Sequence, residues 1–259
     1  MSLTTPSRRR LVAGGGLALG GLMLSGCDRL SRAPTFQALI GRAQEVTMKA
    51  QRLALARQPL AREFTLKDLS PVFKANGTTR PTSPEYLAAE ADDFVSWRLA
   101  IGGLVARTFS LSLAQIKALP ARTQITRHDC VEGWSAIGQW TGVQLGGLLG
   151  AAGVLPTAKY VVFHCADDLA ASSDGSGRYY ESIDLFDAFH PQTLLAYAMN
   201  GAPLAIAHGA PLRLRVERQL GYKHAKYVMH IELVDRLDHI AGGKGGFWED
   251  RGYEWYAGI

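Results

Sequence analysis

Apolar residues recur at helical spacing over residues 35–57, and in most of the remaining chain they alternate with polar residues or form short runs. The helical spacing, carried by Phe36, Ile40 and Val46 among others, predicts an amphipathic helix that stops before Pro59. Charges of both signs share the polar face of this helix. We therefore expect it to pack on the rest of the protein rather than to lie on a membrane surface.

Short strands and short helices make up the rest of the pattern. Strands are predicted over residues 95–101, 123–128, 159–165, 178–183, 194–199, 204–207, 211–216 and 226–234. Short helices are predicted over residues 112–119, 145–152 and 185–189, and Gly153 is expected to end the second of them. Asn200-Gly201 is the strongest hairpin signal, and residues 166–177 read as a loop. Strands and helices do not alternate regularly, so the pattern favours a β-rich α+β fold over a doubly wound parallel sheet.

The composition fits one sizeable core, because 47% of the 259 residues are hydrophobic. The net charge of +5 falls to +2 beyond residue 26, since residues 1–26 hold three arginines and no acid, which leaves 28 − 3 = 25 basic against 23 acidic residues. A balance this close to neutral gives no indication of nucleic-acid binding.

The first residues resemble an export signal. Ser7-Arg8-Arg9-Arg10 precedes an apolar, glycine-rich run over residues 11–24 that is too short for a stable membrane span. The paired arginines fit the twin-arginine route, and Leu24-Ser25-Gly26-Cys27 resembles a lipobox, in which Cys27 is lipidated and becomes the new N-terminus. The alternative is an ordinary cleaved signal with a chance cysteine. We expect residues 1–26 to be the signal peptide, 27–62 a tether and helix, and 63–259 the catalytic domain of a periplasmic, lipid-anchored protein.

Cys130 follows a predicted strand and precedes the turn that we expect between Gly133 and Gly138, on the way to Trp140. This position suits a ligand pocket, because rigid elements commonly hold chemical groups on the loops that join them. A lone cysteine, however, is more often a small buried apolar residue. In an oxidising compartment Cys130 and Cys165 could also form a disulfide.

Three blocks, in this order, resemble the molybdopterin-binding domain of the sulfite oxidase family. They are Cys130-Val-Glu-Gly-Trp-Ser, His208-Gly-Ala-Pro-Leu-Arg213 and Gly221-Tyr-Lys-His-Ala-Lys226. Within the family, the chain looks most like the exported bacterial branch that includes the periplasmic methionine sulfoxide reductase catalytic subunit. The resemblance extends from about Asn76 to Asp235 and implies the β-rich α+β fold of that domain.

The resemblance implies a molybdenum–molybdopterin cofactor and assigns residues to it. Cys130 would be the catalytic thiolate that binds the metal, and Arg213 would meet the phosphate of the pterin. The remaining cofactor contacts implied by the family are Asn76, Cys165, His208, His224, Ala225 and Lys226. Asn76-Gly77 could equally be a plain turn, and Lys223 could lie at the cofactor or in solvent. Cys165 stands where related sequences carry threonine, so it either touches the cofactor or packs at the end of its strand.

The sequence identifies fewer residues of the substrate pocket than of the cofactor site. Tyr179 and Tyr180 lie where sulfite-oxidising members place a tyrosine near the metal, although ordinary core tyrosines are the more common case. Four arginines could surround an oxyanion and cannot be ranked: Arg127, Arg178, Arg215 and Arg218. Asp129 and Glu132 flank the expected ligand as acceptors or ion-pair partners. Residues 246–256 are aromatic and charged, and we expect them to form a strap over the domain rather than a docking surface for a redox partner.

By resemblance, then, the protein transfers an oxygen atom to or from a small or protein-bound sulfur substrate, by sulfoxide reduction or sulfite oxidation. A separate haem or quinone-linked protein would exchange the electrons, because no Cys-x-x-Cys-His motif is present. Little chain follows Asp235, so we expect a monomer without the dimerisation domain of the family. One alternative is a zinc or copper site made by His128, Cys130, His164 and Cys165. The other is a lipoprotein that keeps the fold and binds without turnover.

Overall fold

The structure, a computed structural model, describes residues 33–54, 59–170 and 177–259, and the chain divides into units of residues 1–56 and 57–259. In the first unit the helix α2 spans Pro34–Ala54, close to the predicted residues 35–57. Packing of this helix on the second unit stays a prediction. The arginine pair and Cys27 lie outside the described residues. Within the described parts of the chain, no helix is both long and apolar enough to cross a membrane.

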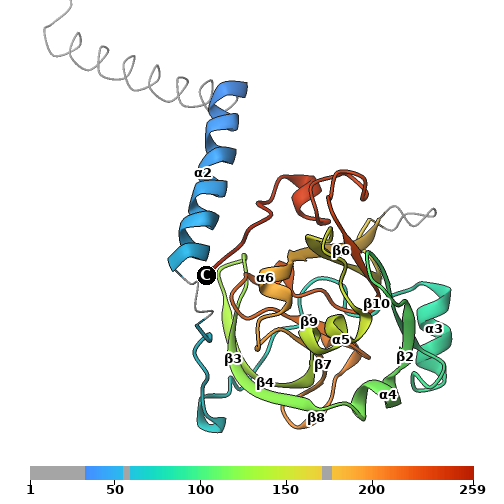
Figure 1. The fold of residues 1–259 in the computed structure, drawn as a ribbon. Helices are drawn as coiled ribbons and strands as arrows, with labels where there is room; N and C mark the ends of the chain where they lie inside the picture. Colours follow the sequence, from blue (N-terminus) through green and yellow to red (C-terminus); the bar gives the residue numbers. More distant parts are fainter. Residues whose placement is uncertain (1–32, 55–58, 171–176) are drawn as a thin grey trace, which may run out of the picture. The chain divides into compact units, whose positions relative to one another are not determined.

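The second unit is a mixed α+β domain built on two sheets (Figure 1). The first sheet has the order β2-β1-β10-β5-β6, in which β1 and β10 are parallel and the other pairs antiparallel. Its strands are β1 (Arg98–Gly103), β2 (Phe109–Ser112), β5 (Tyr160–Asp168), β6 (Arg178–Asp184) and β10 (Val228–Val234). The second, antiparallel sheet has the order β3-β4-β7-β8, with β9 also paired to β7. Its strands are β3 (Ala121–Asp129), β4 (Ser135–Gln144), β7 (Leu194–Met199), β8 (Ala202–Pro203) and β9 (Arg213–Arg215).

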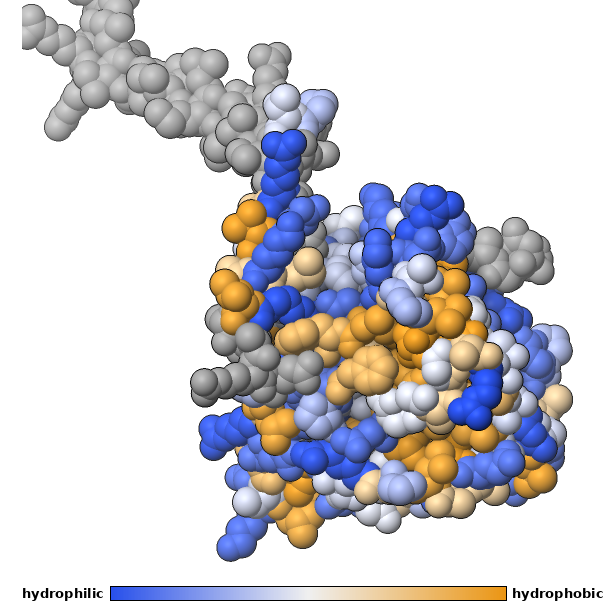
Figure 2. All heavy atoms as spheres, viewed as in Figure 1, coloured by the Kyte–Doolittle hydropathy of each residue, from blue (hydrophilic) through white to orange (hydrophobic). Residues whose placement is uncertain are grey.

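One hydrophobic core holds the two sheets together. It includes Leu99 of β1, Phe163 of β5 and Leu214 of β9, all fully buried, together with Leu149 of α5 (Leu145–Ala152). Burying side chains of this size stabilises a fold by about 1.5–3 kcal/mol each. On the face of the domain shown in Figure 2, apolar side chains gather in the middle and hydrophilic ones lie around them.

The short helices follow the sequence signals closely. The Ser112 hydroxyl caps α4 (Leu113–Lys117) by accepting from the backbone N–H of Gln115 at 3.1 Å. Helix α5 ends at Gly153, as predicted, and α6 (Leu185–Ala188) lies where residues 185–189 were predicted to be helical. The helix α3 (Pro84–Ala91) was not predicted, although Ser83 and Pro84 are a normal helix start. Single 3-10 turns complete the elements: η1 (Leu66–Asp68), η2 (Ile206–His208), η3 (Gly221–Lys223) and η4 (Glu249–Arg251).

The turn predicted between Gly133 and Gly138 is present but shorter: it closes between Cys130 and Trp134, and Gly138 lies inside β4, where it pairs with Thr126 of β3. The strand escapes detection because glycines occupy two of its inward positions. A Cβ on Gly142 would lie 2.1 Å from the Leu195 carbonyl oxygen, and a Cβ on Gly138 would lie 3.2 Å from the Phe73 ring. These glycines let β7 and Phe73 approach the strand closely.

Three other boundaries also need correction. Residues 95–97 precede β1 rather than belong to it, and Val95 is largely exposed. Residues 204–207 are not a strand: the Asn200-Gly201 hairpin returns only through β8, and the chain then enters η2. Residues 166–168 continue β5 instead of beginning a loop, so Asp167 is buried. Residues 171–176 of the expected loop lie outside the described residues.

Candidate functional site

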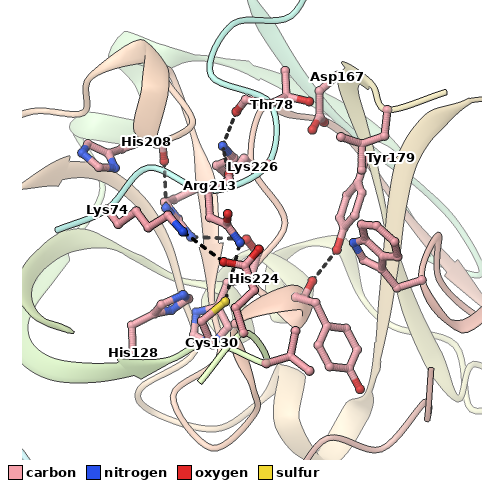
Figure 3. A pocket seen from close by; sticks show the side chains of 18 of the residues that line it. Lys74, Thr78, His128, Cys130, Asp167, Tyr179, His208, Arg213, His224 and Lys226 are labelled. Atoms are coloured by element: carbon pink, nitrogen blue, oxygen red, sulfur yellow. Dashed lines mark hydrogen bonds and ion pairs between the residues drawn. The ribbon is translucent and has the colours of Figure 1, made fainter. Parts of the chain in front are cut away.

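A cavity of about 290 Å³ opens in the second unit, close to the size of a small-molecule site. Its walls come from residues 73–78, the turn after β3, the facing ends of β5 and β6, η2, β9, η3 and the C-terminal segment. These segments lie far apart in the sequence, and the two sheets bring them together. Figure 3 shows how their side chains converge on the cavity.

Cys130 lies in this wall at the end of β3. A tight turn holds its backbone: its N–H donates to the Trp134 carbonyl at 2.9 Å, and its own carbonyl accepts from Gly133 at 3.0 Å. The side chain is 9% exposed, and the Asn76 amide nitrogen lies 3.6 Å from the sulfur. The structure therefore places a free thiol at a rigid position facing the cavity.

Arg213 enters the cavity from β9 without a carboxylate partner among the described residues. Its Nη1 donates to the His208 carbonyl at 2.9 Å, it lies over the Trp140 ring at 4.9 Å, and its buried Nε has no hydrogen-bond partner. Burial and the charge of Arg215 lower the pKa of Arg213 to about 9. An anionic ligand would neutralise the charge of this buried guanidinium and accept the hydrogen bond that its Nε can still donate.

Lys226 supports the opposite wall. Its Nζ donates to the carbonyl oxygens of Asn76, at 2.7 Å, and of Thr78, and so fixes the turn that carries Asn76. Burial and Arg213 lower the pKa of Lys226 to about 8, against the opposing charge of Asp167. Gly77 has a positive φ of 66° in a bend, and Asn76 lines the cavity, so a change of chain direction and a cavity contact are compatible here.

Besides His128, the cavity wall holds His208 and His224, which the family resemblance assigned to the cofactor. His224 Nε2 lies 3.0 Å from the Gln219 carbonyl and so carries the proton, which leaves its buried Nδ1 as an unpaired acceptor. Burial and the charge of Arg215 hold the pKa of His224 well below its usual value. His208 is half-buried, and burial and the neighbouring Arg213 and Lys226 lower its pKa. Both side chains are therefore neutral at pH 7.

Other expected site residues lie elsewhere. Cys165 and Ala225 are buried in the core and do not line the cavity. The four unranked arginines are also outside the lining: Arg127 pairs with Asp129, Arg178 with Glu85, Arg215 with Glu217 and Arg218 with Asp187. Of the two tyrosines only Tyr179 lines the cavity, and of the two acids that flank Cys130 only Glu132 does. The Glu132 carboxylate accepts from Lys74 at 3.1 Å.

The zinc or copper alternative is not supported. In the described residues, no group of three or more His, Cys, Asp or Glu side chains is placed to hold a metal ion. His164 instead pairs with Glu232 at 2.9 Å and stacks on His230. The mixed set of His128, Cys130, His164 and Cys165 is therefore divided between the cavity and the first sheet.

The C-terminal segment forms a strap on the first sheet and supplies one cavity wall. Lys223 is buried and donates to Glu181 at 2.5 Å and to Glu249 of the strap at 2.6 Å. Burial would lower the pKa of Lys223, but the two carboxylates outweigh it and raise that pKa. Lys223 thus anchors the strap instead of reaching the cavity, and the anchored strap brings Trp248 and Tyr253 into the lining.

Sequence reasoning missed several lining residues. Phe73, Trp248 and Tyr253 carry no local signal, because each reaches the cavity only after distant segments pack together. Asp167 was assigned to a loop, although its place directly after a strongly apolar strand could have suggested a position where a strand emerges from the core.

Comparison with known proteins gives a consistent family match. Residues 86–239 match the family described as oxidoreductase molybdopterin binding domain. A protein of Azospira oryzae, described as protein-methionine-sulfoxide reductase subunit YedZ1, is 39% identical over 75% of this chain and 70% of its own length. The protein-methionine-sulfoxide reductase catalytic subunits MsrP of Xanthomonas axonopodis and Xanthomonas campestris are each 36% identical over 60% of this chain. The chain spans only half the length of those two relatives.

Among solved structures, the sulfane dehydrogenase SoxCD of Paracoccus pantotrophus matches with a TM-score of 0.48 and 23% identity. The match covers 55% of this chain and 39% of the SoxCD chain.

Proposed function

Because the chain belongs to the sulfite oxidase family of molybdopterin-dependent oxidoreductases, we propose that it reduces methionine sulfoxide in proteins to methionine. The observation that carries the proposal is the cavity in which the free Cys130 thiol and the unpaired Arg213 guanidinium line the same walls. The relatives' descriptions supply the substrate class. The balanced reaction takes one sulfoxide, two electrons and two protons to one thioether and one water.

The residues present fit a molybdopterin. Cys130 offers the soft anionic ligand that molybdenum takes from a protein, at a position fixed by its turn. Arg213 offers a buried cation to the phosphate and the half-buried Lys226 a second positive charge, and the unpaired atoms of Arg213 and His224 need a polar ligand to complete them. When bound, the metal supplies the two-electron oxygen-atom transfer, and the protein supplies position and electrostatics.

The walls near Cys130 suit a sulfoxide side chain. Val131 and the aromatic rings of Tyr222, Trp248 and Tyr253 line the cavity, and Tyr253 and Val131 are also well exposed at the surface. Methyl and methylene groups pack favourably on such rings, and sulfur does so as well. Sulfite oxidation would instead need cations free to meet an oxyanion. The four arginines suggested for that role are paired outside the lining, and the lining cations Arg213 and Lys226 are assigned to the cofactor, which favours sulfoxide reduction.

The test is an assay of protein produced in a molybdate-replete host. Molybdenum and pterin are first measured per protein. Sulfoxide reduction is then measured with a reduced viologen as electron donor and either an oxidised, methionine-rich protein or free methionine sulfoxide as substrate. Sulfite oxidation is measured with sulfite as substrate and ferricyanide as electron acceptor. We expect sulfoxide-dependent viologen oxidation and little sulfite oxidation. Pterin and molybdenum without turnover in any assay would instead identify a binding protein that keeps the fold, and the opposite preference would reverse the proposed direction.

We further propose that the protein works at the periplasmic face of a membrane, held by lipid on Cys27, and receives electrons from a separate haem or quinone-linked protein. The relatives' descriptions as subunits support a separate redox partner. The twin-arginine and lipobox-like sequences support the location.

Replacing Cys27 by alanine should release the protein from membranes or leave its precursor unprocessed, because the lipid acceptor is lost. Cell fractionation and the mass of the mature chain measure this. Turnover per molybdenum should stay at the parent level, since the catalytic domain is unchanged. Unchanged membrane association would indicate that another segment, such as α2, makes the attachment.

A further inference from the structure

His128 reaches the cavity next to Cys130, and the proposed function gives it no role. It lies on β3 two residues before Cys130, so the two side chains leave the chain on the same side. Although His128 is only 6% exposed, it lines the cavity. Figure 3 shows its ring beside Cys130, directed toward the interior of the cavity. A polar ring in this position would contact what binds next to the metal ligand.

A buried ion pair holds the His128 ring in one state. Arg215 on β9 donates from Nη1 to His128 Nδ1 at 3.0 Å. The Glu217 carboxylate accepts twice from the same guanidinium, from Nε at 2.9 Å and from Nη2 at 2.6 Å, and both side chains are fully buried. A guanidinium only donates, so Nδ1 must carry the lone pair. The ring is therefore neutral, and its proton lies on Nε2.

This arrangement indicates a positioning role for the ion pair. Taking two charges out of water costs about as much as their attraction returns, so a buried ion pair contributes little net stability. Glu217 also accepts from Gln124 at 2.9 Å, and Arg215 lies 4.3 Å from the centroid of the Trp140 ring, so both are fixed in place. The hydrogen bond at one nitrogen of a histidine determines which nitrogen carries the proton.

The Nε2–H of His128 is left as a donor toward the ligand space. Within the part of the chain that the structure describes, this nitrogen makes no hydrogen bond, and the Cys130 sulfur is approached by Asn76 instead. Gly221, which also lines the cavity, leaves the nitrogen uncovered, because a Cβ on this glycine would lie 2.6 Å from Nε2. The cavity thus contains one N–H donor, beside the metal ligand, that a bound molecule can use.

The surroundings of this donor match a methionine sulfoxide. The rings of Phe73 and Trp134 also line the cavity, and the centroid of each lies 5.5 Å from that of His128. A sulfoxide places one strong acceptor, its oxygen, between apolar carbon groups, whereas the sulfur of a thioether is only a weak acceptor. An N–H beside aromatic faces can therefore distinguish the oxidised side chain from the reduced one.

We propose that His128 donates its Nε2–H to the oxygen of the substrate sulfoxide, and that Glu217 and Arg215 are positioning residues that keep the proton on this nitrogen. The inference rests on the proposed function, because it needs a sulfoxide as the substrate. His128 keeps its proton throughout this contact. It selects the sulfoxide over the thioether product and directs the sulfoxide oxygen toward the metal site beside Cys130.

The first test determines the tautomer of His128 in the molybdenum-loaded protein, in its oxidised and diamagnetic state. Nitrogen NMR of isotope-labelled protein shows which ring nitrogen carries the proton, and the His128 signals are identified by their absence from His128→Gln. We expect the proton on Nε2. The double variant Arg215→Met with Glu217→Gln should contain both tautomers, because the donor to Nδ1 is gone. A proton on Nδ1 in the parent would overturn the proposal.

The second test compares the substrate with the product. The KM of methionine sulfoxide and the inhibition constant of methionine are measured in the viologen assay. Losing one hydrogen bond in His128→Leu should raise the KM on the order of ten-fold, while the inhibition constant of methionine, which lacks the oxygen, stays at the parent value. His128→Gln should restore part of the loss, because its amide can still donate. The Arg215 and Glu217 double variant should lie between parent and His128→Leu.

His164→Leu is the matched control, because His164 is also paired with a carboxylate, that of Glu232, but lies outside the lining. It should keep both constants and the parent molybdenum content. An unchanged KM in His128→Leu would overturn the proposal. An equal rise in both constants would overturn it too, since it would show a general loss of structure rather than of one hydrogen bond.

These results would leave the proposed function standing as long as the parent reduces sulfoxide. A parent protein that holds molybdenum and pterin but reduces no sulfoxide would refute the proposed function itself, and the inference with it.

Discussion

Replacing Cys130 by serine is expected to reduce turnover on the order of a hundred-fold or more while much of the pterin stays bound. The reason for the loss is that a serine hydroxyl cannot replace a soft thiolate on molybdenum, and even residues that only support a metal ligand cost about 10–100-fold when changed. The reason for the retention is that Arg213, Lys226 and His224 line the cavity independently of Cys130. Turnover, pterin content and the Mo(V) resonance of the variant measure the three effects.

Cys165→Ala is the matched control, because Cys165 is the other cysteine of the domain and is buried away from the cavity. Burial raises the pKa of its thiol, so it stays protonated and unsuited to a metal. This control should keep molybdenum and turnover. A Cys130→Ser protein that turned over like the parent would remove Cys130 from the metal, and loss of cofactor in Cys165→Ala would restore Cys165 as a cofactor contact.

Replacing Arg213 by alanine is expected to lower the cofactor content of the protein rather than the turnover per bound molybdenum. Truncating one partner of a buried charge pair typically costs about 2–5 kcal/mol, which is enough to prevent stable retention of a phosphate. Arg213→Lys should restore only part of the occupancy, because an ammonium lacks the planar fork that also reaches the His208 and His224 carbonyls. The measurement is molybdenum per protein together with turnover per molybdenum.

Arg127→Ala serves as the control for Arg213. Arg127 lies on β3, three residues before Cys130, but its side chain is exposed and paired with Asp129. Its occupancy and turnover should match those of the parent. If Arg213→Ala kept full occupancy and lost turnover, Arg213 would belong to the substrate pocket. If it kept both, Arg213 would have only a structural role on β9.

Local chemistry explains which parts of the fold could be predicted. The capped helix at Ser112, the helix that ends at Gly153 and the Asn200-Gly201 hairpin each depend on a few adjacent residues, and each is present. Strand β4 depends instead on distant partners: Gly138 is needed because Phe73 packs against it, and no local pattern contains that contact. For this reason the turn was predicted to extend too far, to Gly138.

The same distinction between local motifs and tertiary contacts applies to the candidate site. The family blocks located Cys130, Arg213 and Lys226, because those residues stand in recognisable motifs. Their surroundings could not be read, since whether an arginine is paired or free is decided by tertiary packing. Arg213 and Arg215 are two residues apart on one strand, yet Glu217 neutralises only Arg215 by a direct ion pair. The alternation along the strand does not distinguish the two, and only the family block, which ends at Arg213, does.

The distribution of the cavity lining along the chain has a consequence for biosynthesis. Phe73 stands near the start of the domain and Tyr253 near its end, and the strap that carries Tyr253 is held through the buried Lys223 pair. Contacts between such distant segments form late in folding, because they close the longest loops. A domain in which the strap has not yet packed therefore lacks a complete wall and cannot retain the cofactor. Retained pterin then reports that the domain has finished folding, and a ligand that binds only this state also stabilises it by mass action. If the twin-arginine-like sequence directs export of the folded protein, cofactor loading would act as a checkpoint before transport.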